Sequence, residues 1–255
     1  MCELLGISAK TPHDFRKVLR EFYRHSVTNP HGWGMMYSEK GSMQVVREMK
    51  SADESEKMEK LVAHLEPQRI VMAHIRYATV GGKREHNCHP FVGKDISGRE
   101  WTLIHNGTIY SGSMIAKYAA KQEGDTDSER MFLYLIDEIN GATTRKGEAL
   151  EEKERFAVID GAICKLAYRN KLNLMLYDGE LLYAHKNMKN TLAFKRQRDS
   201  ILLATKPTDD GNWLGLPMTR LLGFRNGKIL YQGTDHGHVF VSSLENITCM
   251  DAMNI

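Results

Sequence analysis

The chain alternates between segments with apolar residues at helical spacing and short runs that are apolar throughout. Apolar residues three or four positions apart predict a helix that ends near His25 and a second helix over residues 54–65. Thr11-Pro12 is expected to start the first helix, because Thr is a common N-cap and Pro is favoured at the first helical position.

Continuous or alternating apolar runs predict strands in the first half of the chain. They cover residues 2–8, 35–38, 43–49, 69–78 and 101–105. A Gly- and His-rich loop, residues 80–91, separates the last two strands. We therefore expect this half to contribute several neighbouring strands to a sheet.

The second half predicts helices at residues 113–122, 127–139 and 147–168, followed by strands from Lys171 onward. Asp178-Gly179 and Asn226-Gly227 lie between apolar runs, where such pairs favour tight hairpin turns. Helices interleaved with hairpins favour an α+β fold with antiparallel sheets over a doubly wound parallel sheet. No repeat or linker is visible, so we expect residues 1–255 to form a single domain.

Composition narrows the class of protein. The chain has 255 residues and a net charge of +3, which gives no electrostatic case for nucleic acid. No apolar run approaches the ~20 residues that span a membrane, and no signal peptide is visible. The four cysteines lack CxxC spacing, so we expect a reduced, cytoplasmic setting.

The first six residues, Met1-Cys2-Glu3-Leu4-Leu5-Gly6, carry the most specific chemistry. If Met1 is removed, Cys2 combines a nucleophilic thiol with a free α-amine, and such an amine titrates near ~8 and can accept the thiol proton. The apolar residues that follow would hold this Cys at the tip of a buried strand. The alternative is an ordinary, lipidated or acetylated cysteine.

Three further stretches contain candidate functional residues. Arg76 ends an apolar strand, where a charge needs a partner and where its planar fork suits a carboxylate. The alternative is a structural salt bridge. Asn106-Gly107 follows another strand, and its side-chain amide and backbone N–H are the donors that an oxyanion hole requires. The alternative is a simple turn.

The third stretch is Gly124-Asp125-Thr126-Asp127-Ser128-Glu129. It predicts a helix N-cap with a capping box, and a carboxylate at this turn can instead hold an ammonium group. A thiolate, an oxyanion pocket, an Arg and an Asp together match free glutamine or another γ-glutamyl compound. The thiol would attack the side-chain amide, and water would release glutamate from the resulting thioester.

Six motifs in this order resemble the class II glutamine amidotransferases, which are N-terminal nucleophile hydrolases, over nearly the whole chain. The resemblance is strongest to the short free-standing members that begin Met-Cys-Glu-Leu-Leu-Gly. The motifs are Met1-Cys2-Glu3-Leu4-Leu5-Gly6, His31-Gly32-Trp33-Gly34, His74-Ile75-Arg76-Tyr77-Ala78-Thr79, Asn87-Cys88-His89-Pro90-Phe91, His105-Asn106-Gly107 and Thr126-Asp127-Ser128-Glu129.

The resemblance implies a four-layer αββα sandwich with two antiparallel sheets. It implies Cys2 as the nucleophile, its own amine as the base, and Asn106 and Gly107 as the oxyanion hole. The residues that it implies for substrate binding are Arg76 and Thr79 for the carboxylate, Asp127 for the amine, and His89, Gly32 and Trp33 around the pocket. We expect no metal and no cofactor.

The chain departs from the family pattern at two positions. Many relatives have Asp where this chain has His31, and synthase-linked relatives often have His-Gly where this chain has Val80-Gly81. The contributions of these positions are therefore open, as is that of the segment Thr205-Lys206-Pro207. The length leaves no room for a synthase domain, so ammonia is expected to pass to a separate protein or to be the end product.

Other interpretations remain at this stage. His86, Cys88 and His89 are close enough in sequence for a metal site that His74 or His105 would complete, although the spacing is not a standard zinc pattern. The enzyme could hydrolyse a γ-glutamyl bond in a larger metabolite or peptide instead of glutamine. A non-catalytic glutamine-binding subunit is the third alternative. The sequence does not define the oligomeric state.

Overall fold

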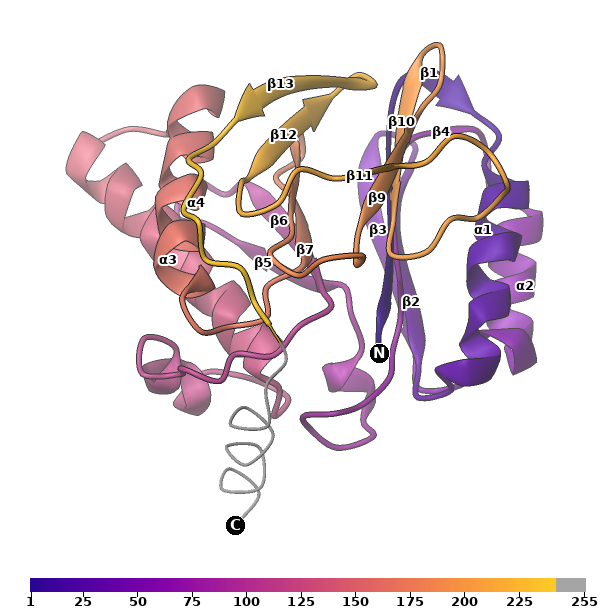
Figure 1. Cartoon of the computed structure of the whole chain (residues 1–255), viewed down its shortest axis with the longest axis horizontal. Coiled ribbons are helices and arrows are strands. Elements are labelled where there is room, and N and C mark those ends of the chain that lie inside the picture. Colours follow the sequence, from indigo (N-terminus) through magenta and orange to yellow (C-terminus); the bar gives the residue numbers. More distant parts are fainter. Residues whose placement is uncertain (242–255) are drawn as a thin grey trace.

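The structure, a computed structural model, describes residues 1–241, which form two antiparallel sheets packed face to face between helices (Figure 1). The strands of the first sheet are β1 (Glu3–His13), β2 (Trp33–Glu39), β3 (Ser42–Glu48), β4 (Gln68–Ile75), β9 (Ala193–Arg196), β10 (Ser200–Ala204) and β11 (Leu214–Gly215). The strands of the second sheet are β5 (Phe91–Lys94), β6 (Glu100–His105), β7 (Leu174–Tyr177), β8 (Leu182–His185), β12 (Leu222–Arg225) and β13 (Lys228–Gln232).

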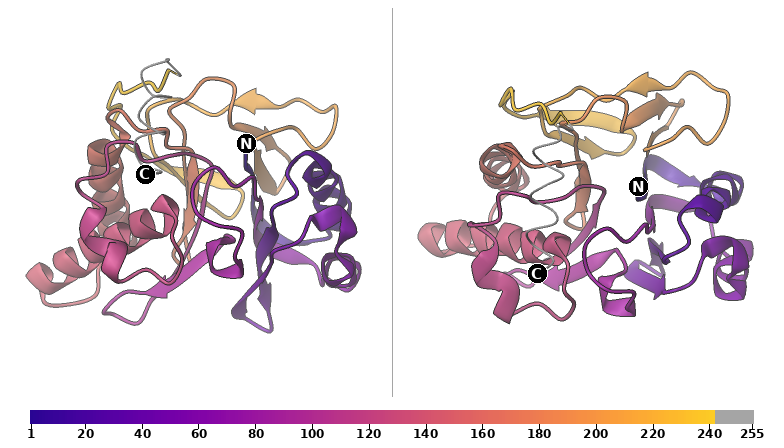
Figure 2. Two further views of the ribbon diagram at one scale, coloured as in Figure 1. Left: turned by 90° about the horizontal axis from the view of Figure 1, so that it is seen from below. Right: turned by 60° about the horizontal axis from the view of Figure 1, so that its bottom comes forward.

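Helices cover the outer face of each sheet. The helices are α1 (Arg16–Arg24), α2 (Glu56–Ala63), α3 (Asp127–Lys146) and α4 (Glu152–Ala167), with short 3₁₀ helices η1 (His25–Thr28), η2 (Ala52–Glu54), η3 (Glu85–Asn87) and η4 (Ala116–Ala120). Helices α1 and α2 lie on the first sheet and α3 and α4 on the second, as all views show (Figure 2). This arrangement confirms the predicted four-layer αββα sandwich.

The hydrophobic core follows these layers. One cluster packs each sheet against its helices, and a third fills the space between the sheets. Alternation along β1 serves both faces, because Leu5 and Ile7 point to the helix side while Leu4 points to the inter-sheet core. Strand β1 lies between β10 and β4 in the first sheet, so the N-terminal segment enters the middle of the sandwich.

The predicted helix start at Thr11-Pro12 is wrong, because both residues belong to β1. The register between β1 and β4 is interrupted between Ser8 and His13, so the missing N–H of Pro12 does not break a regular ladder. Helix α1 begins at Arg16, and the carboxylate of Asp14 accepts a hydrogen bond from the Arg16 backbone N–H at 2.9 Å.

Two other predictions also need correction, and one strand was missed. Residues 113–122 contain only the short helix η4, and Gly147 ends α3 in a left-handed conformation (φ 81°) instead of starting α4. Strand β5 at the edge of the second sheet was not predicted. The turn at Asn226-Gly227 is confirmed, with both residues at positive φ between β12 and β13.

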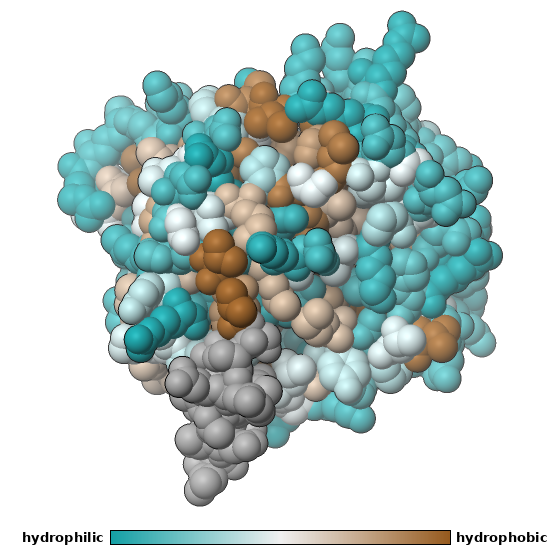
Figure 3. All heavy atoms as spheres, in the orientation of Figure 1, coloured by the Kyte–Doolittle hydropathy of each residue, from teal (hydrophilic) through white to brown (hydrophobic). Residues whose placement is uncertain are grey.

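The surface is mostly polar over the helices, and hydrophobic residues gather over the strands and loops in the middle of the face in Figure 3. Within residues 1–241, no helix combines the length and the hydrophobicity that crossing a membrane requires.

Candidate active site

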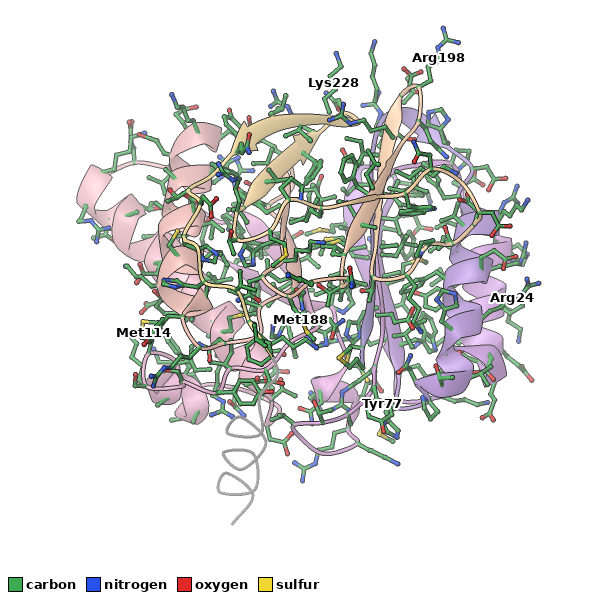
Figure 4. The ribbon with its side chains drawn as sticks, in the orientation of Figure 1. Arg24, Tyr77, Met114, Met188, Arg198 and Lys228 are labelled. Carbon is green, nitrogen blue, oxygen red and sulfur yellow. The ribbon has the colours of Figure 1, made fainter. Side chains whose placement is uncertain are left out.

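Cys2 lies at the entrance of the central strand β1, half-buried, against the segment that follows β4. The backbone N–H of Tyr77 donates to Cys2 Sγ at 3.2 Å, and the thiol donates to the Tyr77 carbonyl oxygen at 3.4 Å. Tyr77 lies at the opposite end of the molecule from Arg198 and Lys228 (Figure 4). The first two predicted stretches, around Cys2 and Arg76, therefore meet.

Arg76 follows β4 and is 3% exposed. Its Nη2 donates to the carbonyl oxygens of Val80, Gly81 and Gly82 at 3.2–3.4 Å, whereas its buried Nη1 has no partner among residues 1–241. No carboxylate in this part of the chain pairs with it, so the predicted alternative of a structural salt bridge is not found there. A buried guanidinium with one free edge is suited to a ligand carboxylate.

The residues before β2 hold this segment in place. The His31 N–H donates to the Arg76 carbonyl oxygen (3.1 Å), the Arg76 N–H donates to the Gly32 carbonyl oxygen (2.8 Å), and the Ala78 N–H donates to His31 Nδ1 (2.9 Å). His31 thus orders the backbone that contacts Cys2. Gly32 has φ +140°, and an added Cβ would lie 2.6 Å from Cys88 Sγ.

Asn106 and Gly107 follow β6 in the facing sheet. The Asn106 backbone N–H donates to the Asn173 carbonyl oxygen at 2.8 Å, and the Asn106 carbonyl oxygen accepts from Asn173 Nδ2 at 2.9 Å. The Asn106 side-chain Nδ2 is buried and has no partner among residues 1–241. A Cβ on Gly107 would lie 2.0 Å from the Lys171 carbonyl oxygen, so only glycine fits. This turn therefore presents a fixed, free donor.

Two contacts join the Cys2 end of the first sheet to the Asn106 end of the second. His74 Nε2 donates to the carbonyl oxygen of His105 at 3.3 Å, and His74 pairs with Leu4 in the sheet register. Lys171 Nζ donates to Met1 Sδ at 2.8 Å, and the Lys171 backbone pairs with Thr108. The nucleophile and oxyanion stretches thus lie at the same end of the inter-sheet space.

The start of α3 is attached to the same region. Asp127 Oδ2 accepts from the Ile109 N–H at 2.7 Å, Asp127 Oδ1 accepts from the Ser128 N–H at 2.9 Å, and Ser128 Oγ lies 2.9 Å from His105 Nδ1. Thr126 is the predicted N-cap and accepts from the Glu129 N–H. Glu129 does not close a capping box, because its carboxylate accepts from the backbone N–H groups at positions 123 and 124.

Asp125 and Asn87 connect the Arg76 loop to α3, and the sequence prediction missed both as positioning residues. The Asp125 carboxylate accepts from the Gly82 N–H at 3.1 Å and from Asn87 Nδ2 at 2.5 Å. Asn87 Nδ2 also donates to the Gly82 carbonyl oxygen at 2.8 Å. Asn87 belongs to one of the six motifs and Asp125 to the candidate stretch at residues 124–129, but nothing in the sequence indicated that they pair across 38 positions.

The other predicted pocket residues fall in different environments. His89 is 4% exposed and stacks against His74 with ring centroids 4.2 Å apart, and neither of its ring nitrogens has a partner among residues 1–241. Thr79 is exposed in the loop after Arg76. The Trp33 side chain lies in the core beneath α1 and α2, where its Nε1 donates to Glu48 at 2.9 Å, so it does not reach the inter-sheet space.

The grouping considered for a metal does not assemble. Within residues 1–241, no three His, Cys, Asp or Glu side chains are placed to hold an ion. His86 is exposed beside Glu123, and Cys88 Sγ donates to the carbonyl oxygens of Glu48 and Arg84 at 3.7 Å.

The segment Thr205-Lys206-Pro207, whose role was open in the sequence analysis, contacts the start of β1. Thr205 Oγ1 accepts from the Leu4 N–H at 3.0 Å, and Lys206 Nζ lies 2.5 Å from Glu3 Oε1. Glu3 is 1% exposed and its second oxygen lies 2.7 Å from His25 Nδ1. These contacts hold the residue next to Cys2 from both sides.

Burial and the neighbouring charges have opposite effects on the pKa of the Cys2 thiol. Burial raises the pKa of the Cys2 thiol, whereas the Tyr77 N–H and the positive charges of Arg76, the N-terminal amine and Lys171 lower it. The net direction for the chain that retains Met1 is a raised pKa. The thiol of this form therefore stays protonated at neutral pH.

Buried neutral histidines should make the fold sensitive to acid. Burial lowers the pKa of His74 and His185 to about 3 and that of His105 to about 4, below the ordinary value. Each therefore takes up a proton on unfolding as the pH falls below ~6.5, and each lowers the free energy of unfolding by about 1.4 kcal/mol per pH unit around pH 5.

Urea unfolding at pH 7, 6 and 5 checks this expectation. The His185→Asn variant, altered away from Cys2, should show a shallower pH dependence by about one proton. A free energy of unfolding that stays constant from pH 7 to 5 would contradict the account.

Residues 1–199 match the family of class II glutamine amidotransferases, and the chain belongs to that family. It is similar to a candidate glutamine amidotransferase of Haemophilus influenzae (30% identity over 72% of this chain and 63% of the relative). It is also similar to the candidate glutamine amidotransferase YafJ of Escherichia coli (30% identity, 72% of each chain). An uncharacterized protein of Methanocaldococcus jannaschii is 27% identical over 91% of this chain and 71% of its own length.

Solved structures share the fold. The crystal structure of a predicted glutamine amidotransferase from Pseudomonas aeruginosa matches with a TM-score of 0.63 and 22% identity over 90% of this chain and 100% of that one. The glutamine phosphoribosylpyrophosphate amidotransferase of Bacillus subtilis matches with a TM-score of 0.67 and 14% identity, over 92% of this chain and 49% of that one. At these identities the likeness concerns the fold alone.

Proposed function

We propose that this protein is an amidohydrolase that cleaves the side-chain amide of glutamine through a thioester on Cys2, once Met1 has been removed. The observation that carries the proposal is a pair of buried donors without partners among residues 1–241, Arg76 Nη1 and Asn106 Nδ2. The segment of Arg76 contacts Cys2, and the turn of Asn106 is joined through Lys171 to Met1. Buried donors of this kind need an acceptor, and a bound amino acid supplies both a carboxylate and a carbonyl oxygen.

The reaction uses the two groups of an N-terminal cysteine. The freed α-amine takes the thiol proton, and the thiolate attacks the side-chain carbonyl carbon as the carbon–sulfur bond forms. The amine returns the proton to the leaving nitrogen, and ammonia departs. Water then attacks the thioester, and glutamate and the thiol are released.

Asn106 Nδ2 and the Gly107 N–H stabilise the negative oxygen of each tetrahedral intermediate in this mechanism. At the other end of the substrate, Arg76 and Thr79 bind the α-carboxylate and Asp127 binds the α-amine. His89 lines the pocket with its free ring nitrogens. These roles are supported by the contacts that bring the Arg76 loop, Asp125 and the start of α3 together.

The Asn106→Ala variant tests the oxyanion role. We expect kcat for glutamate release to fall about a hundredfold or more, with little change in KM, because the lost donor acts mainly in the transition state. Enzymatic measurement of glutamate under steady-state conditions provides both constants. The exposed Asn212 is a matched control, and equal kcat values for Asn106→Ala and Asn212→Ala would contradict the role.

Glutamine is the proposed substrate. We propose that its ammonia is either released as the end product or passed to a separate synthase. A larger γ-glutamyl compound would present the same α-carboxylate and α-amine to the pocket. Comparing kcat/KM for glutamine with that for a panel of γ-glutamyl amides and peptides decides between them. A higher kcat/KM for a larger compound would identify that compound, and not glutamine, as the substrate.

A further inference from the structure

Lys171 is a buried cation without a carboxylate partner among residues 1–241. The residue is 7% exposed, and the polar contact that its ammonium makes in this part of the chain is with the thioether of Met1, at 2.8 Å. A thioether sulfur is a weak acceptor, and burying a charge without a strong partner is costly. A nearby anion would therefore stabilise the Lys171 ammonium, and residues 1–241 of the chain that retains Met1 place none against it.

The backbone fixes Lys171 beside the proposed oxyanion hole. Its N–H donates to the Thr108 carbonyl oxygen at 3.1 Å, and its own carbonyl oxygen accepts from the Thr108 N–H at 3.0 Å. Thr108 follows Gly107 directly. The side chain reaches from this turn to Met1, the residue in front of Cys2. Lys171 thus connects the turn that contains Gly107 in the second sheet to Met1, which precedes Cys2 in the first sheet.

We propose that Lys171 is a positioning residue whose ammonium faces Cys2 once Met1 has been removed, and that it stabilises the thiolate formed when the α-amine takes the thiol proton. The inference deepens the proposed function and rests on it. Removal of Met1 takes away the thioether and leaves the ammonium next to the new N-terminus. The thiolate of Cys2 is then the missing anion.

The effect has a defined direction. A neighbouring cation favours a thiolate, so the Cys2 thiol loses its proton at a lower pH than it would without Lys171. In the chain that retains Met1, burial lowers the pKa of Lys171, and the interaction with Cys2 opposes this effect. Among residues 1–241, Arg76 and the N-terminal amine also act electrostatically on the Cys2 thiol. Cys88, in the loop before β5, interacts with Cys2 in the same way, and His105 interacts with Lys171. Glu3 turns away, toward Lys206 and His25.

The test compares Lys171→Met with Lys171→Arg in the full chain from which Met1 has been removed. The rate of Cys2 alkylation by iodoacetamide, located by peptide mass, is measured from pH 5 to 9, together with kcat/KM for glutamate release. We expect Lys171→Met to move the midpoint of the alkylation profile up by about one pH unit, so that alkylation near pH 6.5 is roughly tenfold slower. Lys171→Arg should restore the wild-type profile.

Lys186→Met is the matched control, because Lys186 is also buried (4% exposed) but its Nζ donates to the Leu192 carbonyl oxygen at 2.8 Å. Its profile should equal that of the wild type. Lys171→Gln is measured in parallel, so that the test does not depend on one variant folding. An unchanged profile in either folded uncharged variant, or an equal shift in Lys186→Met, would overturn the inference. Wild-type protein that is neither alkylated at Cys2 nor active on glutamine would instead overturn the proposed function.

Discussion

Replacing Cys2 with Ala is expected to lower the rate of glutamate release from glutamine by at least about a thousandfold, because no other group in the proposed mechanism supplies the nucleophile. The fold should persist, since the residue is half-buried before β1 and contacts Tyr77 through its sulfur. We expect the free energy of unfolding to change by less than about 1 kcal/mol. Coupled glutamate assays and urea unfolding measure the two quantities.

A second cysteine provides the control for this result. Cys164 is half-buried in α4, remote in the fold from the start of β1, and the Cys164→Ala variant should retain the wild-type rate. Glutamate release by Cys2→Ala at the rate of Cys164→Ala would remove Cys2 from the mechanism.

Replacing Arg76 with Ala should reduce kcat/KM for glutamine about a hundredfold or more, mainly through KM, because the substrate carboxylate loses its charged partner in a buried site. The variant should also lose some stability, since Nη2 holds three backbone carbonyl groups of the following loop. Steady-state kinetics and thermal unfolding separate the two effects.

A substrate analogue distinguishes carboxylate binding from general damage. 4-Aminobutanamide has the reacting amide but no α-carboxylate, so the wild type and Arg76→Ala should process it at similar, low kcat/KM. Arg84→Ala, an exposed change in the same loop, should leave kcat/KM for glutamine unaltered. A hundredfold difference on the analogue as well would show that Arg76 acts through structure and not through the carboxylate.

Local patterns in the sequence predicted antiparallel sheets with helices, and the family resemblance predicted the four layers. The apolar run after Cys2 predicts a buried strand, and the structure places it at the centre of a sheet. Asn106, whose side-chain donor has no partner among residues 1–241, follows the end of a strand that the sequence predicted. The helix start predicted at Thr11-Pro12 is wrong because β1 continues through these residues to His13, which pairs with Gln68 of β4. Pairing in the sheet overrides the local preference for starting a helix.

The local patterns did not predict contacts between residues that are far apart in the sequence. Asn87 and Asp125 bind each other across 38 positions, and Lys171 and Met1 across 170. The ion pair of Glu3 with Lys206 likewise depends on β10 lying beside β1. Hydrophobic periodicity indicates which face of an element is buried, but it does not specify which polar side chains meet at the ends of the strands.

The central claim is that an exposed amino-terminal thiol at position 2 reacts with a glutamine-like electrophile. Intact-mass analysis before and after treatment with a diazo-ketone analogue of glutamine, followed by peptide mapping, tests it directly. We predict a chain that lacks Met1 and carries one adduct on Cys2. Cys88 should stay unlabelled, because burial raises its pKa to about 11. A chain that retains Met1 and forms no adduct, or an adduct on another cysteine, would contradict the account.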